Sequence, residues 1–323
     1  MRNSVKSFII QLISNNITTP IDLIVLPELG LTGYNFSSSN AIKPYLESYE
    51  NKQANNFSLN FAKSLSEKYN CFTVVGYPES SSSDIIYNSC ALFNRQGELI
   101  HNYRKTFLYE TDEVWGCSEG DKKGFKSIDV DFAAGTATPV SIWDRFRINE
   151  DKKSETSLRV NFGICMDLNP YKFEAPFNEF EFSSSCYEQR SNLMICPMAW
   201  LSPKSPSINK EISLSERVEI ANQTKLDKGP DQSTVNYWIL RMFPFLSHKY
   251  SYSPKWFNKV NVLCCNRVGV EGDIIFGGSS SILEFNNSGK NYESINQDNE
   301  SVTILGSLSQ ADEEVLIKEI ECL

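Results

Sequence analysis

The chain has 323 residues, of which 41% are hydrophobic and 22% are charged, a balance typical of a soluble enzyme with a substantial core. Its net charge is −9 and no segment concentrates lysine and arginine, which argues against a nucleic-acid partner. No run approaches the ~20 apolar residues of a membrane span, so no membrane partner is expected. The nine cysteines are odd in number and several lie inside strand-like runs, which predicts reduced thiols and a cytoplasmic location, and no C-x-x-C pair suggests a zinc site.

The N-terminal segment predicts an amphipathic helix of the domain rather than a targeting signal. Phe8, Ile9, Leu12 and Ile13 recur at helical spacing. Neither a long apolar core nor a small-residue cleavage site accompanies them, and both would be needed for a secretory signal.

Apolar strand-like runs and amphipathic helix patterns alternate over most of the chain, which predicts an α/β fold. The expected strands are 22–27, 71–77, 87–94, 98–104, 158–165, 193–197, 260–266 and 279–285. Residues 57–69 predict a helix with Phe57, Phe61 and Leu65 on one face, and 94–97 predicts a hairpin turn.

Two polar stretches predict loops, at about 144–157 and about 202–231. The second is rich in Ser, Pro, Lys and Asn, and we expect it to be exposed. Neither stretch separates two complete cores, and no internal repeat is present. We therefore expect a single domain over 1–323.

Three reactive side chains stand where predicted strands end. Glu28 closes the first strand run, Lys105 the fourth and Cys165 the fifth. In a sheet covered by helices, ligands collect beyond the strand ends, so these three can converge on one pocket. A thiol beside a carboxylate and an ammonium is a nucleophile with its proton carrier and its anion stabiliser. The pattern predicts a cysteine amidohydrolase.

Cys165 has a setting that favours catalysis over the alternative, a small buried hydrophobe. Gly163 keeps the strand slim, and the Asn169–Pro170 pair forces a turn that leaves the thiol at a bend. The backbone amide of Met166 would then be free to bind an oxyanion. Lys105 is expected to hold the thiolate at neutral pH.

Glu28 and Lys105 are both expected to be enclosed. Glu28 follows an apolar strand and precedes a glycine-rich turn, which favours a position in the wall of a pocket. The alternative for Glu28 is an ion pair at the end of its strand. Lys105 lies among aromatic residues, and an enclosed ammonium needs a carboxylate partner. Asp112 or Glu113 could supply that supporting acid, unless both belong to an exposed loop.

Histidine chemistry is not favoured. The chain has only two histidines, His101 and His248, and neither has the setting of a catalytic triad. His101 shares a predicted strand face with Lys105, so it stays open as an alternative base. No phosphate-binding glycine loop or metal cluster occurs, and we expect no cofactor and no metal.

These segments together resemble the nitrilase, or carbon–nitrogen hydrolase, superfamily. The match consists of Leu-Pro-Glu28-Leu-Gly, Tyr-Arg-Lys105 and Gly-Ile-Cys165-Met-Asp in chain order, with 265–269 and 276–280 similar to its C-terminal segment. The resemblance spans roughly 20–285. It implies a four-layer α-β-β-α sandwich in which Glu28, Lys105 and Cys165 are catalytic.

Within that superfamily, the stretches 103–109, 163–177, 196–201 and 235–241 resemble the yeast-type protein N-terminal amidases. The resemblance implies that the side chain of an N-terminal Asn or Gln is deamidated to Asp or Glu, with ammonia released through a Cys thioester. The substrates would be proteins or peptides that enter the pathway marking proteins for degradation by their N-terminal residue. Such enzymes usually begin with a strand ahead of the first helix, whereas this sequence begins almost at that helix, so it stays open whether one family strand is missing here.

Binding of a free α-ammonium would be served best by a carboxylate near the pocket. Asp167 and Glu174 are the candidates by motif proximity, although Asp167 could simply organise the turn after Cys165. Trp115 and Trp200 are candidate pocket walls or, equally, core aromatics.

Two other functions stay open. One is a small-metabolite amidase of the same superfamily that acts on ω-amides, and the other is a catalytically silent interaction protein on that fold. The oligomeric state is also open between a monomer and a homodimer.

Overall fold

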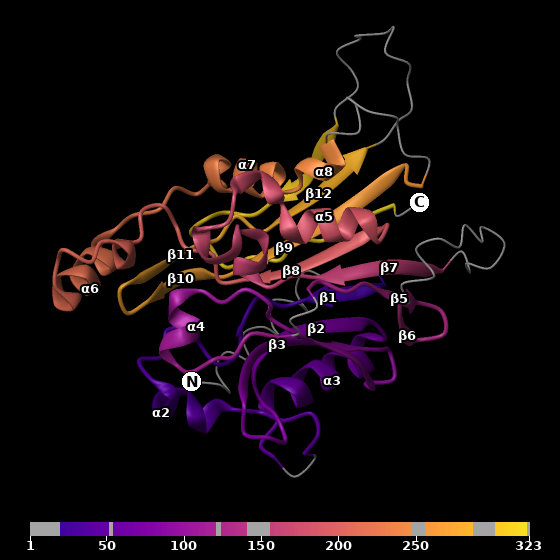
Figure 1. Cartoon of the computed structure of the whole chain (residues 1–323), viewed down its shortest axis with the longest axis horizontal. Helices are drawn as coiled ribbons and strands as arrows, with labels where there is room; N and C mark the ends of the chain where they lie inside the picture. The colour runs from indigo at the N-terminus through magenta and orange to yellow at the C-terminus, as the bar shows by residue number, and fades with distance from the viewer. Residues whose placement is uncertain are drawn as a thin grey trace, which may run out of the picture.

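A computed structural model of the chain describes residues 20–51, 54–120, 124–140, 156–246, 256–286 and 301–321 (Figure 1). The predicted helix over Phe8–Ile13, the question of a missing first strand, and His248 all lie outside these ranges. So does most of the predicted loop at 144–157.

The first sheet has four strands in the order β1-β2-β3-β4. They are β1 (Leu23–Val25), β2 (Phe72–Ser80), β3 (Ile86–Phe93) and β4 (Leu99–Arg104). β1 runs parallel to β2, and the other pairs are antiparallel. Helix α3 (Phe57–Tyr69) packs its Phe61, Ala62 and Leu65 face against this sheet.

The second sheet has seven strands in the order β13-β12-β9-β8-β7-β5-β6. Its three middle strands are parallel, and the strands flanking them pair antiparallel. The strands are β5 (Ile128–Asp131), β6 (Thr136–Pro139), β7 (Ser157–Phe162), β8 (Leu193–Met198), β9 (Lys259–Asn266), β12 (Ser281–Asn286) and β13 (Val302–Ser307).

Helices cover the outer face of this second sheet. They are α5 (Glu181–Glu188), α7 (Gln232–Arg241) and α8 (Phe243–Leu246). The remaining elements are α2 (Ser39–Ile42), α4 (Glu110–Val114), α6 (Leu214–Gln223), the hairpin strands β10 (Val268–Glu271) and β11 (Ile274–Gly277), and the 3₁₀ helices η1 (Lys43–Tyr45), η4 (Cys165–Leu168), η5 (Tyr171–Phe173), η6 (Phe177–Glu179) and η7 (Pro206–Ile208).

The two sheets pack face to face between the helical layers. Phe162 of β7 contacts the rings of His101 and Tyr103 of β4, at centroid distances of 5.2 and 6.3 Å. In Figure 1 α3 lies below the first sheet, and α5, α7 and α8 lie above the second. The predicted α-β-β-α sandwich is confirmed.

All eight predicted strands are present, and α3 has the predicted bounds. The fifth ends at Phe162 rather than at Cys165, because the chain turns into η4 there. The prediction of a loop over 202–231 is wrong in part, since η7 and α6 lie inside it. The Ser213 side chain accepts a hydrogen bond from the Glu216 amide at 3.3 Å, and this Ser-x-x-Glu pattern was the signal for the start of α6.

The eight cysteines that the structure describes are all free thiols. Within the same residues, no helix has both the length and the apolar character needed to cross a bilayer.

Candidate active site

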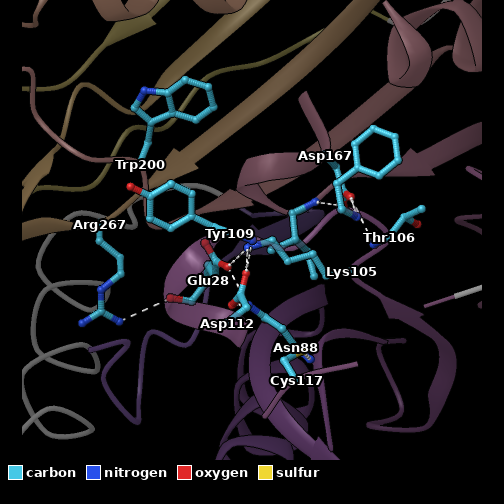
Figure 2. A network of polar contacts seen from close by, with 12 residues as sticks. Glu28, Asn88, Lys105, Thr106, Tyr109, Asp112, Cys117, Asp167, Trp200 and Arg267 are labelled. Carbon is cyan, nitrogen blue, oxygen red and sulfur yellow. Dashed lines mark hydrogen bonds and ion pairs between the residues drawn. The ribbon is translucent and has the colours of Figure 1, made fainter. Parts of the chain in front are cut away.

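Glu28 stands just beyond β1, on a chain segment held tightly against β2. A Cβ placed on Gly76 of β2 would lie 2.7 Å from the Leu29 nitrogen and 2.9 Å from the Glu28 Cα, so only glycine permits this approach. Leu29 then turns with a positive φ of 45°. Arg267 Nη1 donates to the carbonyl oxygens of Glu28 (3.3 Å) and Leu29 (2.7 Å) and braces the turn from the other side (Figure 2).

Lys105 follows β4 and its ammonium is completely buried. Nζ lies 2.7 Å from Glu28 Oε1 and 2.7 Å from Asp112 Oδ2, so two carboxylates share it (Figure 2). Asp112 lies on α4 and is itself fully buried, whereas Glu113 is exposed. Of the two acids expected near Lys105, the structure brings Asp112 to it and leaves Glu113 outside.

Asn88 completes this network, and sequence reasoning missed it. Its Nδ2 donates to Glu28 Oε1 at 2.6 Å and to Asp112 Oδ1 at 2.9 Å. Asn88 is a buried amide in the predicted strand 87–94, and a polar residue inside such a run was the available signal. Arg267 was also missed, although it lies in the segment 265–269 that resembles the superfamily.

The charges in this network are set by burial and by one another. Burial disfavours the charged form of Lys105, but the Asp112 and Glu28 carboxylates outweigh it and raise the pKa of Lys105 well above its usual value. Burial raises the pKa of Glu28, with Lys105 opposing and Asp112 reinforcing that shift. A carboxylate with a raised pKa is a better proton acceptor near neutral pH than an ordinary one.

One oxygen of Glu28 is unused. Oε1 accepts from both Lys105 and Asn88, whereas Oε2 is buried with no hydrogen-bond partner among the described residues. An unpartnered buried carboxylate oxygen costs stability. Such an atom can receive a proton from a group that lies beside it.

Cys165 begins η4 with a positive φ of 44°, a strained conformation for a residue other than glycine. Two residues earlier, a Cβ on Gly163 would lie 2.8 Å from the Phe182 ring, so the chain needs a residue without a side chain at this position. Cys165 lines a cavity of about 510 Å³ and is 7% exposed. The thiol therefore lies at a bend with access to a ligand.

The thiol is electrostatically coupled to the network. Burial raises the pKa of Cys165, and the Glu28 carboxylate raises it further. The Lys105 ammonium opposes both effects, but the pKa remains well above its usual value. This direction runs against the expectation that Lys105 holds a thiolate at neutral pH. A thiol with a raised pKa must lose its proton as the sulfur reacts.

Asp167 is a structural brace, and the expectation that it binds substrate is wrong. It is fully buried and its carboxylate accepts hydrogen bonds from the Ile164 amide (2.7 Å), the Phe107 amide (2.7 Å) and the Tyr103 hydroxyl (2.8 Å). Burial raises its pKa to about 7. Asp167 thereby ties the chain just after Lys105 to the turn that carries Cys165.

The cavity beside Cys165 is walled mainly by aromatic and apolar side chains. Its lining residues are Tyr109, Cys165, Met166, Asn169, Phe173, Ala199, Trp200, Leu201, Pro203, Ile208, Ser233, Thr234 and Tyr237. No Asp or Glu of the described chain is among them. Figure 2 places the Tyr109 ring between Trp200 and the buried carboxylates.

Two of the expected binding residues are elsewhere. Trp115 is completely buried in a core cluster with Tyr34 and Phe276, so the expectation that it walls the pocket is wrong. Glu174 is exposed and follows the cavity residue Phe173 without lining the cavity itself. Trp200 and Met166 do line it.

His101 is only partly buried on β4, and it does not line the cavity beside Cys165. Burial lowers its pKa to about 4, and its ring packs on Phe162. In the described part of the chain, no group of three or more His, Cys, Asp or Glu is arranged to hold a metal ion.

Comparison with known proteins agrees with this geometry. A model of the carbon-nitrogen hydrolase family matches residues 6–149. The protein N-terminal amidase of Saccharomyces cerevisiae is 32% identical over 410 residues, covering 93% of this chain and 87% of that protein. The protein N-terminal amidase of Schizosaccharomyces pombe is 32% identical over 269 residues, covering 82% and 79%.

Solved structures match over nearly the whole chain. A crystal structure of N-terminal amidase has a TM-score of 0.73 at 29% identity, covering 96% of this chain and 92% of that one. Crystal structures of N-terminal amidase with an Asn-Glu-Ala peptide and with a Gln-Gly peptide match with the same coverage, at TM-scores of 0.73 and 0.72 and 28% identity.

Replacing Gly76 by alanine should displace Glu28. The added Cβ meets backbone atoms rather than a flexible side chain, so the β1 end must move, and we expect the rate on an amide substrate to fall at least ~10-fold. Gly229→Ala is the matched control, because a Cβ there meets nothing within 4 Å. Steady-state kinetics on the two purified variants tests this, and a Gly76→Ala enzyme with full activity would contradict it.

Replacing Asn88 by alanine should shift the pH dependence of the reaction. The Asn88 hydrogen bond lowers the pKa of Glu28, so its loss raises that pKa. Because the base must be deprotonated to act, the acidic limb of the kcat/KM profile should move to higher pH by about 1 unit. Asn94→Ala, at a buried amide that bonds Glu98 and Gly135 instead, should leave the limb in place. An unmoved limb in Asn88→Ala would exclude this link to Glu28.

Proposed function

The chain belongs to the protein N-terminal amidase family of the carbon–nitrogen hydrolases, and we propose that it hydrolyses the side-chain amide of an N-terminal Asn or Gln to give Asp or Glu and ammonia. The observation that carries this proposal is the buried network of Glu28, Lys105 and Asp112 beside a cysteine that lines a cavity. Relatives solved with peptides that begin with Asn and with Gln support the substrate class.

The first half of the reaction forms a thioester. Cys165 Sγ attacks the amide carbon while its proton passes to Glu28 Oε2, the oxygen that accepts no hydrogen bond from the described residues. The Lys105 ammonium and the Met166 amide stabilise the oxyanion that develops. Glu28 then gives the proton to the amide nitrogen, the C–N bond breaks, and ammonia leaves.

The second half hydrolyses the thioester. Glu28, again unprotonated, takes a proton from a water molecule as the water oxygen attacks the thioester carbon. The same two donors stabilise the second oxyanion. The C–S bond breaks, the sulfur regains its proton from Glu28, and the product carries a carboxyl group where the amide was.

The α-ammonium of the substrate needs a site other than a carboxylate in the cavity wall. The rings of Trp200 and Tyr237 both line the cavity with centroids 5.6 Å apart, and aromatic faces attract a cation. The Asn169 Oδ1 beside them accepts from the Tyr237 hydroxyl at 2.8 Å and has a second lone pair to offer. We assign the ammonium to this corner, with the exposed Glu174, which follows the cavity residue Phe173, adding only a weak attraction.

In the cell, this reaction would convert an N-terminal Asn or Gln into the acidic residue that a degradation pathway reads. Substrates would then be proteins or their fragments with a newly exposed N-terminus. A cytoplasmic location is consistent with the free thiols of the described residues.

The direct test compares peptides that begin with Asn or Gln with the same peptides acetylated at the N-terminus. Ammonia release should be at least ~10-fold faster in kcat/KM from the free peptides, because acetylation removes the charge that the aromatic corner binds. Cys165→Ala should lower the rate by more than ~10³-fold. Trp200→Leu should reduce the preference for free over acetylated peptides. Trp256→Leu is the control and should keep that preference, because the Trp256 ring packs on Tyr187 and Phe245 and does not line the cavity.

The outcomes separate the remaining alternatives. Equal turnover of free and acetylated peptides would remove the N-terminal specificity and leave a general amidase. Hydrolysis of small ω-amides in preference to peptides would indicate a metabolite amidase. Ammonia release that persists in Cys165→Ala would refute the catalytic assignment.

A further inference from the structure

A second cavity adjoins the one that holds Cys165. It has a volume of about 210 Å³ and lies between the α4 and α6 segments, over Ile274 of β11. Tyr109 and Leu201 line both cavities, so the two share walls. Figure 1 shows α4 and α6 on the same side of the molecule.

The most exposed large apolar side chains of the described residues line these two cavities. Among the described residues, the four most exposed large apolar side chains are Val114 (57%), Phe173, Ile208 and Leu214 (59% each), and the next is Val270 at 44%. Phe173 and Ile208 line the first cavity, and Val114 and Leu214 line the second. Clustered exposed apolar groups mark a surface that a ligand or partner covers.

Charged groups at the second cavity are already paired within the protein. Lys210 Nζ lies 3.4 Å from Glu110 Oε2, and Arg217 Nε lies 2.8 Å from Asp273 Oδ2. An ionised side chain entering this space would have to compete with these pairs. An apolar side chain would instead cover Val114 and Leu214 without disturbing any ion pair.

We propose that the second cavity binds the side chain of a residue just after the deamidated Asn or Gln, and that it selects an apolar side chain. This inference rests on the proposed function. When the first side chain reaches toward Cys165, the chain leaves past Tyr109 and Leu201, the walls that lead into the second cavity. One residue of extended chain spans about 3.5 Å, so the second or third residue comes within reach.

The test measures kcat/KM for ammonia release from peptides that begin with Asn and carry Gly, Leu or Asp at the second or third position. Leu should exceed Gly by about 10-fold at one of these positions, and Asp should give no gain. Leu214→Ser should bring the Leu-to-Gly ratio close to one, whereas Leu214→Met should keep it. Ile317→Ser, at an exposed apolar residue outside both cavities, is the matched control and should also keep the ratio.

The two proposals fail differently. Hydrolysis of every peptide with no preference at either position, or a preference for Asp, would overturn the apolar subsite and leave the amidase. A ratio unchanged in Leu214→Ser would also overturn the subsite. No ammonia from any peptide would overturn the proposed function, and the subsite with it.

Discussion

The structure depends on one buried ammonium. Lys105 has no exposed surface, and Glu28 and Asp112 each bring a carboxylate oxygen to 2.7 Å from its Nζ. Removing one partner from a buried ion pair typically costs about 3–5 kcal/mol, so all three charges require one another. Two carboxylates share one ammonium, so one negative charge is left without a cationic partner. Burial disfavours that charge and raises the pKa of Glu28. The arrangement that keeps Lys105 charged therefore also makes Glu28 a competent base.

The surrounding chain fixes this network in place from three directions. Gly76 lets the end of β1 lie against β2, and Arg267 braces the turn behind Glu28. Asp167 joins the segment after Lys105 to the turn of Cys165, so the ammonium and the thiol cannot move independently. These contacts come from distant parts of the chain. They hold the reactive groups at one end of the two packed sheets, where the cavity opens.

The sequence was informative where the pattern was local. Apolar periodicity correctly predicted eight strands and the helix α3. The ends of three of those predicted strands then pointed to Glu28, Lys105 and Cys165. The choice between Asp112 and Glu113 depends on which side of the short α4 is buried, and neighbouring residues give no such information. The pKa of Cys165 could not be foreseen either, because it depends on burial and on the charge of Glu28, more than 130 positions away. Asp167 was proposed as a binding residue because it lies next to the Cys165 motif, and its structural role could not be seen because the hydrogen bonds that it accepts from the Phe107 and Ile164 amides form only in the fold.

The central claim is that this network delivers the Cys165 sulfur to an amide carbon. Mass spectrometry of the intact protein, acid-quenched during turnover of a peptide that begins with Gln, tests it most directly. The account predicts an adduct with the mass of the peptide less ammonia, mapped to Cys165 and absent from Cys165→Ala. Steady turnover without any adduct, or an adduct on another residue, would contradict it.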